Sequence, residues 1–305
     1  MIKDILPQLD TAEAALAAAD ETERDTLLIR RAALLEQCRS VTATDKVFLA
    51  RHPKRPKIDD YIAALFTDFF EQRGDRQCRE DASILGGIAL FDGRPVTVIG
   101  HRKGRNLEEN MAYNFGMPGP EGYRKALRIM RQAEKFGRPV ITFIDTPGAY
   151  PGMEAEERGQ SEAIAGNLAA MSRLRVPVIS VVTGEGNSGG ALALGVADRV
   201  LMLENAYYAV LSPEGFASIL WKDPARRDEA CEVMKLTAED LLGFGVIDEI
   251  VEEPLGGAQR DHAALYRALH QSIARALDAL CAVPVDALLH QRYDKYRHIA
   301  PVSVK

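Results

Sequence analysis

The chain has 305 residues, of which 47% are hydrophobic and 27% are charged, and its formal net charge is −6 at pH 7. This length suits one large α/β domain with extensions or two small domains, and the apolar content is that of a globular protein with a full core. The negative charge argues against general affinity for nucleic acid or anionic membranes. Because no long apolar run and no signal-peptide pattern occur, we expect a cytoplasmic protein without a membrane span.

The four cysteines, Cys38, Cys78, Cys231 and Cys281, are far apart in the sequence. They form neither a C-x-x-C pair nor any other metal-ligand spacing. We therefore interpret them as reduced packing residues, and we predict no metal site in this chain.

The first fifty residues are predicted to be helical. Residues 1–20 read as an exposed helix or a frayed arm, and residues 21–38 carry the apolar spacing of an amphipathic helix. Thr44 is expected to cap a short helix that Pro53 ends. The basic, proline-punctuated residues 51–57 are then either a solvated loop or an arm that meets an acidic partner or a ligand phosphate.

The spacing of apolar residues then changes from that of a helix to that of strands. Residues 58–72 have a wide apolar face at helical spacing, and Gly74 is the expected stop. Residues 84–91 and 95–100 instead predict two strands of a β-hairpin, because the Asp-Gly pair at 92–93 is a strong turn signal.

The middle of the chain repeats strand, loop and helix. Two nearly continuous apolar strands, at 139–145 and 177–183, are each followed by a glycine turn and a helix. This order predicts a largely parallel sheet whose ligand loops lie at the carboxyl ends of the strands. The neighbouring elements are expected at 121–136 (helix), 154–174 (long helix) and 200–203 (strand).

The last third is mixed and ends in helices. After residues 212–215 the chain reads as helical through Trp221, and Thr237 is expected to cap a helix at 238–243. The remaining expected elements are a strand at 246–251, a hinge at Gly256-Gly257, a helix at 263–280 and an amphipathic tail at 288–298.

The glycine-rich stretch from Thr183 to Leu194 follows an apolar strand and leads into small apolar residues. Consecutive glycines let the backbone approach a ligand closely, and the first turn of a helix offers N–H groups without internal partners. Such a stretch favours binding of a phosphate or of an oxyanion that forms during a reaction. A purely structural glycine turn is the alternative that needs no ligand.

Two other motifs compete for this stretch. Gly184, Gly186 and Gly189 fit the dinucleotide fingerprint, with Glu204 at the distance of a ribose-binding acid, although Glu185 would place a carboxylate beside the pyrophosphate. Residues 186–190, Gly-Asn-Ser-Gly-Gly, also resemble a serine-protease motif, but no partner histidine is evident.

A third interpretation of this stretch is an oxyanion hole formed by backbone N–H groups alone. The turns Gly148-Ala149 and Gly189-Gly190 follow successive strands and would end on the same side of the sheet. A two-donor oxyanion hole needs one N–H from a strand-end loop and one from the next helix start. These four residues are therefore the predicted catalytic donors.

Several long blocks, between about residues 45 and 255, resemble the alpha subunit of the bacterial-type, multi-subunit acetyl-CoA carboxylase carboxyltransferase. Their order along the chain makes the resemblance more specific than any one glycine motif. The blocks are Ala50–Pro53, Asn114–Pro118, Pro120–Ala126, Phe143–Thr146, Gly148–Gly152, Glu156–Ala165, Gly184–Gly186, Ser188–Leu192 and Ser212–Gly215.

The resemblance implies an α/β crotonase/ClpP-like fold, a spiral of repeated ββα units with helical extensions. The expected division is an N-terminal helical arm at 1–40, the carboxyltransferase domain at 41–255 and a C-terminal helical extension at 256–305. It also implies transfer of carboxylate from carboxybiotin, tethered to a biotin carboxyl carrier protein, to acetyl-CoA. The product is malonyl-CoA, in the first committed step of fatty acid biosynthesis.

The family also implies partners. A beta subunit, expected in an α2β2 heterotetramer, supplies the acetyl-CoA side of the site and carries a cysteine-ligated zinc. A biotin carboxylase uses ATP to load the carrier. By family analogy the biotin anion takes the proton from acetyl-CoA, so no side-chain base is required.

On the biotin side, Gly189 and Gly190 are expected to donate to the ureido oxygen, assisted by Gly148 and Ala149. Gly186, Asn187, Ser188 and Tyr150 are expected to form the biotin pocket. Asn187 stands where many relatives have glycine, and asparagine tolerates left-handed backbone angles better than most residues. Lys103 and Arg105 are candidates for contact with CoA phosphates.

Two alternatives stay open at this point. One is a stand-alone crotonase-type acyl-CoA hydratase or isomerase, which would need a carboxylate facing the oxyanion hole and activity without a partner. The other is a dinucleotide-binding protein.

Overall fold

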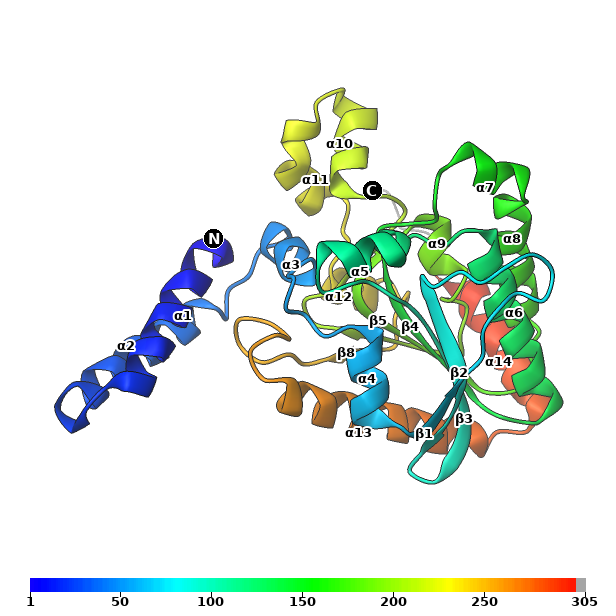
Figure 1. Cartoon of the computed structure of the whole chain (residues 1–305), viewed down its shortest axis with the longest axis horizontal. Coiled ribbons are helices and arrows are strands. Elements are labelled where there is room, and N and C mark those ends of the chain that lie inside the picture. The colour runs from blue at the N-terminus through cyan, green and yellow to red at the C-terminus, as the bar shows by residue number, and fades with distance from the viewer. Residues whose placement is uncertain (300–305) are drawn as a thin grey trace.

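The computed structural model describes residues 1–299, which form one mixed eight-stranded sheet with helices on both faces (Figure 1). The sheet order is β1-β2-β3-β4-β5-β6-β8, with β7 pairing to the end of β5. The strands β1 to β3 are antiparallel, and β3 to β6 and β8 are parallel. The bounds are β1 Thr67–Glu71, β2 Ile84–Phe91, β3 Arg94–His101, β4 Val140–Thr146, β5 Val178–Asn187, β6 Arg199–Leu203, β7 Tyr207–Ala209 and β8 Glu249–Val251.

The helices include a projecting pair, α1 and α2, and a small lobe, α10 and α11 (Figure 1). Short 3-10 turns lie at Asn114–Gly116 (η1) and Pro224–Arg226 (η2). The helix bounds are α1 Ile2–Ala18, α2 Glu21–Gln37, α3 Ala43–Ala50, α4 Ile58–Leu65, α5 Leu107–Ala112, α6 Pro120–Lys135, α7 Met153–Glu157, α8 Gln160–Met171, α9 Ser188–Leu192, α10 Pro213–Trp221, α11 Arg227–Val233, α12 Ala238–Gly243, α13 His262–Cys281 and α14 Val285–His298.

Two strand glycines show how closely the helices cover the sheet. A Cβ at Gly86 would lie 2.9 Å from the Ile129 side chain of α6, and one at Gly100 would lie 2.7 Å from the Ile58 side chain of α4. Gly86 pairs with Ile99, the neighbour of Gly100, so the two glycines face opposite sides of the sheet. Helices α6 and α4 accordingly cover opposite faces (Figure 1).

Much of the predicted order is confirmed. The hairpin of β2 and β3 pairs antiparallel about the Asp-Gly turn, and every residue of β4 is buried. Thr237 caps α12 with its side chain, as expected, and Ser212 caps α10 in the same way. No helix within residues 1–299 has the length and apolar character needed to cross a membrane.

The predicted helix at 58–72 is wrong in its second half. Helix α4 ends at Leu65, Phe66 is extended, and the following residues form β1. Strand β1 pairs with β2, and a Cβ at Gly87 would lie 2.2 Å from the Phe70 carbonyl oxygen. Because aromatic residues suit strands and Gly87 allows this close approach, pairing with the hairpin overrides the helical period.

The predicted long helix at 154–174 is also two helices, α7 and α8. Gly159 separates them with a left-handed backbone (φ 84°). Just before this break, the Arg158 Nε donates to Glu121 Oε1 at 2.8 Å, which ties the α7 end to the start of α6. A continuous helix would move this arginine away from its partner.

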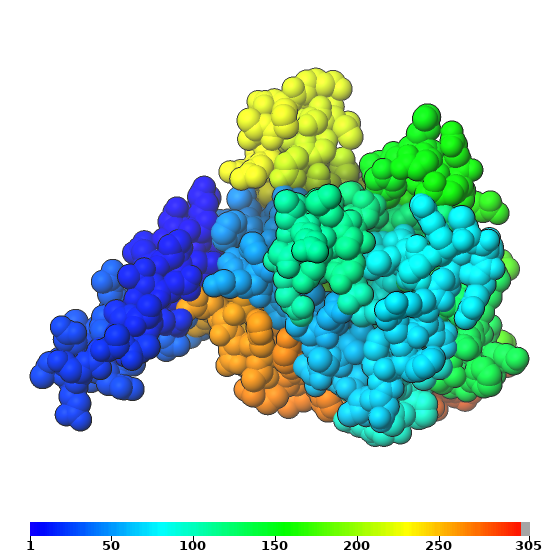
Figure 2. All heavy atoms as spheres, in the orientation of Figure 1, coloured from blue at the N-terminus to red at the C-terminus, as the bar shows by residue number. Residues whose placement is uncertain are grey.

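The N-terminal arm is an ordered helical pair that projects from the body (Figures 1 and 2). Leu9, Ala12 and Leu34 form the seam between α1 and α2, and Ile2 and Leu6 are buried beside Leu255 and Leu49. The cap of α3 is Thr42 in a capping box with Asp45, rather than Thr44. The division at residues 40 and 255 stays a prediction.

Candidate active site

The two glycine turns meet at one edge of the sheet. Gly148 and Ala149 follow β4, Gly190 lies in α9 just after β5, and β4 and β5 are parallel neighbours. A Cβ at Gly190 would lie 2.5 Å from the Ala149 nitrogen and 2.7 Å from the Gly148 carbonyl carbon. Only glycine fits this contact.

We call Gly148, Ala149, Gly189 and Gly190 the turn contact. Gly189 and Gly190 are the second and third residues of α9, so their N–H groups have no intrahelical acceptor, and the side chain of the N-cap residue Asn187 does not cap them. Within residues 1–299 the Ala149 N–H also lacks an acceptor, whereas the Gly148 N–H donates to Thr146 Oγ1 at 3.0 Å. Three of the four predicted donors therefore have open amides.

Ser188 is the residue in a left-handed conformation here, with φ 59°, and its side chain is exposed. The arrangement does not support a protease-like nucleophile, since no histidine or carboxylate within residues 1–299 hydrogen-bonds to the Ser188 hydroxyl. The buried His101 instead places Nε2 3.2 Å from the Gly190 carbonyl oxygen. Burial lowers the His101 pKa to about 4, so the ring is neutral at pH 7 and Nε2 donates.

Asn187 does not need the left-handed tolerance proposed from the sequence. Its backbone is extended (φ −111°, ψ 136°), and its side chain is fully buried. Its Nδ2 donates to the Tyr207 hydroxyl at 2.9 Å. Asparagine is therefore held here by a side-chain contact.

The four residues predicted to form the biotin pocket do not line one cavity. Ser188 and Gly189 line an apolar cavity of about 410 Å³ together with Tyr208 and Tyr296. Tyr150 lines a separate, polar cavity of about 410 Å³. Gly186 is buried in the ladder between β5 and β7, where a Cβ would lie 2.8 Å from the Tyr208 ring, and Asn187 is buried beside it.

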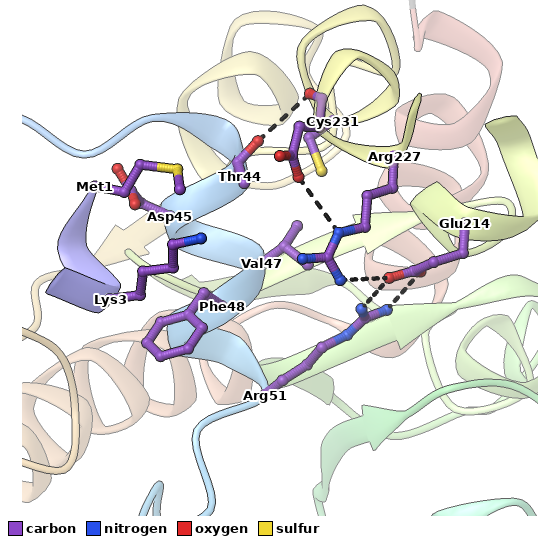
Figure 3. A pocket seen from close by; sticks show the side chains of 11 residues that line it. Met1, Lys3, Thr44, Asp45, Val47, Phe48, Arg51, Glu214, Arg227 and Cys231 are labelled. Atoms are coloured by element: carbon purple, nitrogen blue, oxygen red, sulfur yellow. Dashed lines mark hydrogen bonds and ion pairs between the residues drawn. The ribbon is translucent and has the colours of Figure 1, made fainter. Parts of the chain in front are cut away.

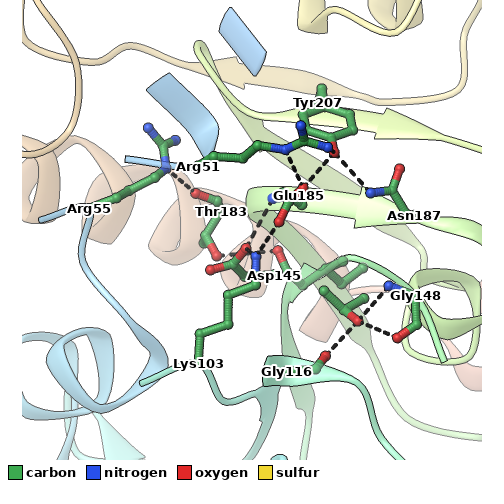
Figure 4. Close-up of polar contacts among 12 residues, drawn as sticks. Arg51, Arg55, Lys103, Gly116, Asp145, Gly148, Thr183, Glu185, Asn187 and Tyr207 are labelled. Carbon is green, nitrogen blue, oxygen red and sulfur yellow. Dashed lines mark hydrogen bonds and ion pairs between the residues drawn. The ribbon is translucent and has the colours of Figure 1, made fainter. Parts of the chain in front are cut away.

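Beside the turn contact lies a buried group of paired charges (Figure 4). Lys103 Nζ, just after β3, donates to Asp145 Oδ1 of β4 and to Glu185 Oε2 of β5, both at 2.7 Å. The Glu185 backbone N–H donates to Asp145 Oδ1 at 3.0 Å. Lys103 is thus committed to two carboxylates and is not an open phosphate ligand.

Arg51 and Tyr207 complete this group. Arg51 Nε donates to Glu185 Oε1 at 2.7 Å, and the Tyr207 hydroxyl donates to the same oxygen at 2.6 Å. We call Arg51, Lys103, Asp145, Glu185 and Tyr207 the strand-end cluster. Burial would raise the Glu185 pKa, but Lys103 and Arg51 outweigh this effect and lower it to about 2.

The cluster also reaches the α10–α11 lobe. Arg51 Nη1 donates to Glu214 Oε1 at 2.7 Å, and Arg227 of the lobe lies 3.8 Å from the same oxygen (Figure 3). These residues line a cavity of about 110 Å³ between α3 and the lobe. In Figure 2 the lobe and α7 rise on either side of a hollow.

The basic segment 51–57 is therefore not a solvated loop. Arg55 is fully buried, donates from Nε to the Thr183 carbonyl at 2.6 Å and pairs through Nη1 with Glu253 at 3.0 Å. Arg105, in contrast, has a 54% exposed side chain that pairs with Asp60.

Sequence reasoning missed the strand-end cluster as a unit. One signal was present: Lys103, Asp145 and Glu185 each stand at or just beyond the end of an apolar strand core. The carboxyl ends of neighbouring parallel strands lie together, so charges at those positions meet. Arg51 carried no such signal, because its partners are 134 and 163 residues away in sequence.

The structure does not support the dinucleotide-binding interpretation of Gly184, Gly186 and Gly189. Helix α9 has only five residues, and Glu185 is ion-paired within the cluster. The Glu204 carboxylate accepts the Glu253 N–H at 3.0 Å, which occupies the proposed ribose-binding acid. The acidic residues that the dinucleotide motif would use are therefore both engaged in contacts within the protein.

The fold is shared with solved structures of a transcarboxylase and of a malonate decarboxylase. A transcarboxylase 12S structure superposes with a TM-score of 0.60 at 22% identity, over 80% of this chain and 44% of that chain. The chain thus spans less than half of the transcarboxylase chain. A Pseudomonas malonate decarboxylase hetero-tetramer in complex with coenzyme A superposes with a TM-score of 0.57 at 21% identity, over 70% of this chain and 84% of that chain. The architecture is therefore the expected crotonase-like α/β fold.

Sequence comparison is more specific. Residues 6–300 match the family model described as acetyl co-enzyme A carboxylase carboxyltransferase-like. The acetyl-coenzyme A carboxylase carboxyl transferase subunit alpha of Clostridium acetobutylicum is 56% identical over 87% of this chain and 97% of its own length. That of Listeria welshimeri is 54% identical over 93% of this chain and 90% of its own. The chain belongs to the family of acetyl-CoA carboxylase carboxyltransferase alpha subunits.

Proposed function

We infer that this chain is the alpha subunit of an acetyl-CoA carboxylase carboxyltransferase. It transfers carboxylate from carrier-bound carboxybiotin to acetyl-CoA and forms malonyl-CoA, the first committed step of fatty acid biosynthesis. The observation that carries the proposal is full-length similarity to curated alpha subunits. The open amides of the turn contact supply chemistry that suits it.

The proposed chemistry uses the backbone. When carboxybiotin loses CO2, negative charge builds on the ureido oxygen, and preorganised N–H groups stabilise such a charge. We assign this role to Gly189, Gly190 and Ala149. The Gly148 N–H is bound to Thr146, so Gly148 shapes the loop with its φ of 138°, where a side chain would be strained.

The biotin side of the site is proposed at the apolar cavity beside Ser188 and Gly189. Its lining, which includes Leu192 and Tyr208, suits the uncharged ring system of biotin. The carboxyl-carrier protein delivers the biotin, and a biotin carboxylase loads it with ATP. We place the acetyl-CoA side and the cysteine-ligated zinc on a beta subunit, in an α2β2 complex in the cytoplasm.

The hydratase or isomerase alternative is not favoured. It needs a free carboxylate at the oxyanion hole, but Asp145 and Glu185 are both paired with Lys103. The curated relatives compared are all carboxyltransferase alpha subunits.

Co-expression with a zinc-ribbon beta subunit tests the proposal. The purified complex should decarboxylate malonyl-CoA in a reaction that depends on free biotin, and the isolated chain should not. Robust turnover by the chain alone, or biotin-independent hydration of an enoyl-CoA, would overturn the assignment.

A further inference from the structure

Asn187 occupies a position where its side chain would ordinarily block the proposed site. It is the N-cap residue of α9, and its extended backbone is the conformation of N-cap residues. An asparagine at this position normally accepts hydrogen bonds from the second or third N–H of the helix. In α9 those N–H groups belong to Gly189 and Gly190, the proposed oxyanion donors.

The expected cap is absent. The Asn187 side chain does not cap α9, and its Nδ2 donates instead to the Tyr207 hydroxyl at 2.9 Å. The Asn187 Oδ1, the atom that would form the cap, is buried and has no hydrogen-bond partner within residues 1–299. An acceptor therefore lies two and three residues before the open donors, Gly189 and Gly190, and does not engage them.

The Tyr207 hydroxyl is fixed from three sides. A phenol has one proton to donate and accepts through its oxygen lone pairs. The Tyr207 proton goes to Glu185 Oε1 at 2.6 Å, and the oxygen accepts from Asn187 Nδ2 and from Arg51 Nη2, each at 2.9 Å. Glu185 is itself held by Lys103 at 2.7 Å. The hydroxyl is thus a fixed anchor for the Asn187 amide (Figure 4).

We propose that Tyr207 is a positioning residue that holds the Asn187 side chain away from the Gly189 and Gly190 amides, so that a ligand oxygen can reach them. The inference rests on the proposed function of those amides. Without the hydroxyl, the Asn187 amide loses its anchor, and rotation of its side chain lets Oδ1 form the ordinary cap. The protein would then occupy its own donors.

A purely structural role for Tyr207 makes a different forecast. Removal of a buried hydroxyl would lower the melting temperature, and a second substitution at Asn187 would lower it further without a gain in turnover. The positioning role forecasts that the second substitution restores turnover, because it removes the competing cap. The two roles therefore differ in whether the added substitution at Asn187 restores turnover.

The test compares Tyr207→Phe, the double variant Tyr207→Phe/Asn187→Ala and the control Tyr266→Phe. Tyr266 packs edge-on against Tyr61 at 5.8 Å between ring centroids, on α13. A crystal structure of Tyr207→Phe should show Asn187 Oδ1 within hydrogen-bond distance of the Gly189 or Gly190 nitrogen. An Asn187 side chain that keeps its wild-type position would overturn the inference, whatever the activity.

Turnover in the assembled complex gives the second readout. Tyr207→Phe should lower kcat for biotin-dependent malonyl-CoA decarboxylation about 100-fold, the cost of one lost oxyanion donor, with little change in KM. The double variant should recover most of that loss, and Tyr266→Phe should match the wild type. If Tyr207→Phe is slower than the wild type, a double variant that is no faster than Tyr207→Phe would overturn the inference. A new cap in the crystal with unchanged kcat would support the positioning of Asn187 and overturn the assignment of the amides.

Discussion

The strand-end cluster and the turn contact lie at the same edge of the sheet. Their polar groups differ in whether they have hydrogen-bond partners within the protein. In the cluster, every charge has a partner: Lys103 has two carboxylates, and Glu185 has Lys103, Arg51 and the Tyr207 hydroxyl. In the turn contact, the Ala149, Gly189 and Gly190 amides are open. Buried charges must be paired, whereas amides at a turn can be left for a ligand.

At this edge of the sheet the side chains form a frame, and the backbone supplies the proposed chemistry. Mutations in the turn contact should therefore act mainly on turnover, and mutations of the charged residues of the cluster mainly on stability. Tyr207 differs from its charged neighbours because it positions Asn187 beside the proposed donors.

The largest effect is expected at Gly190. Gly190→Ala should lower kcat of the assembled complex by roughly 100- to 1,000-fold, or about 3–4 kcal/mol in activation free energy, because the new Cβ displaces the Ala149 backbone. Since that clash is with backbone, assembly must be measured beside kcat. Gly189→Ala is the matched control: its Cβ meets only Ile164 at 3.5 Å, so it should lose less turnover. Near-wild-type kcat in an assembled Gly190→Ala complex would remove Gly190 from the site.

Glu185→Ala should show the second-largest effect, and on stability. It leaves the Lys103 and Arg51 charges without their shared partner, which typically costs about 3–5 kcal/mol for a buried pair. Chemical denaturation of the isolated chain measures this loss, and Glu185→Gln, which keeps the shape, should lose less. Wild-type stability in Glu185→Ala would show that the cluster is not a frame.

His101 predicts the pH dependence of stability. Its pKa falls from 6.5 to about 4 on folding, so the unfolded chain binds more protons between these values and stability drops as pH falls. The expected loss from pH 7 to pH 5 is about 2 kcal/mol. Denaturation curves at both pH values measure it, and His101→Gln should flatten the slope. Glu185, with a pKa of about 2, should not contribute in this window. A His101→Gln variant with the wild-type slope would contradict this account.

Ser188→Ala is expected to have the smallest effect. The side chain is exposed and the proposed site uses the backbone, so kcat should change by less than about threefold. Steady-state kinetics of the assembled complex measures this change. A loss of several orders of magnitude would instead indicate a nucleophile.

Local sequence patterns predicted those parts of the molecule whose causes are local. The hairpin about Asp92-Gly93, the buried β4 and the Thr237 cap each follow from neighbouring residues. The meeting of the two glycine turns followed from the order of parallel strands. In these cases the neighbouring residues or the order of the strands were enough to predict the structure.

The failures have partners that are distant in sequence. Residues 67–71, predicted as the second half of a helix, form strand β1 because they pair with the edge of β2. Arg55, predicted in a solvated loop or an arm, is buried because Glu253, 198 residues away, neutralises its charge. From the sequence alone, Asn187 is explained by the tolerance of asparagine for left-handed backbone angles. In the structure, the hydrogen bond from its side chain to Tyr207 fixes its position instead. None of these partners is visible from a local window.

The most direct measurement is a crystal structure of the assembled alpha–beta complex with biotin bound. We expect the ureido oxygen to lie about 2.7–3.1 Å from main-chain nitrogens of the turn contact, among Ala149, Gly189 and Gly190, with the strand-end cluster unchanged. A ureido oxygen bound instead by a charged side chain such as Lys103, or placed away from these amides, would contradict this expectation.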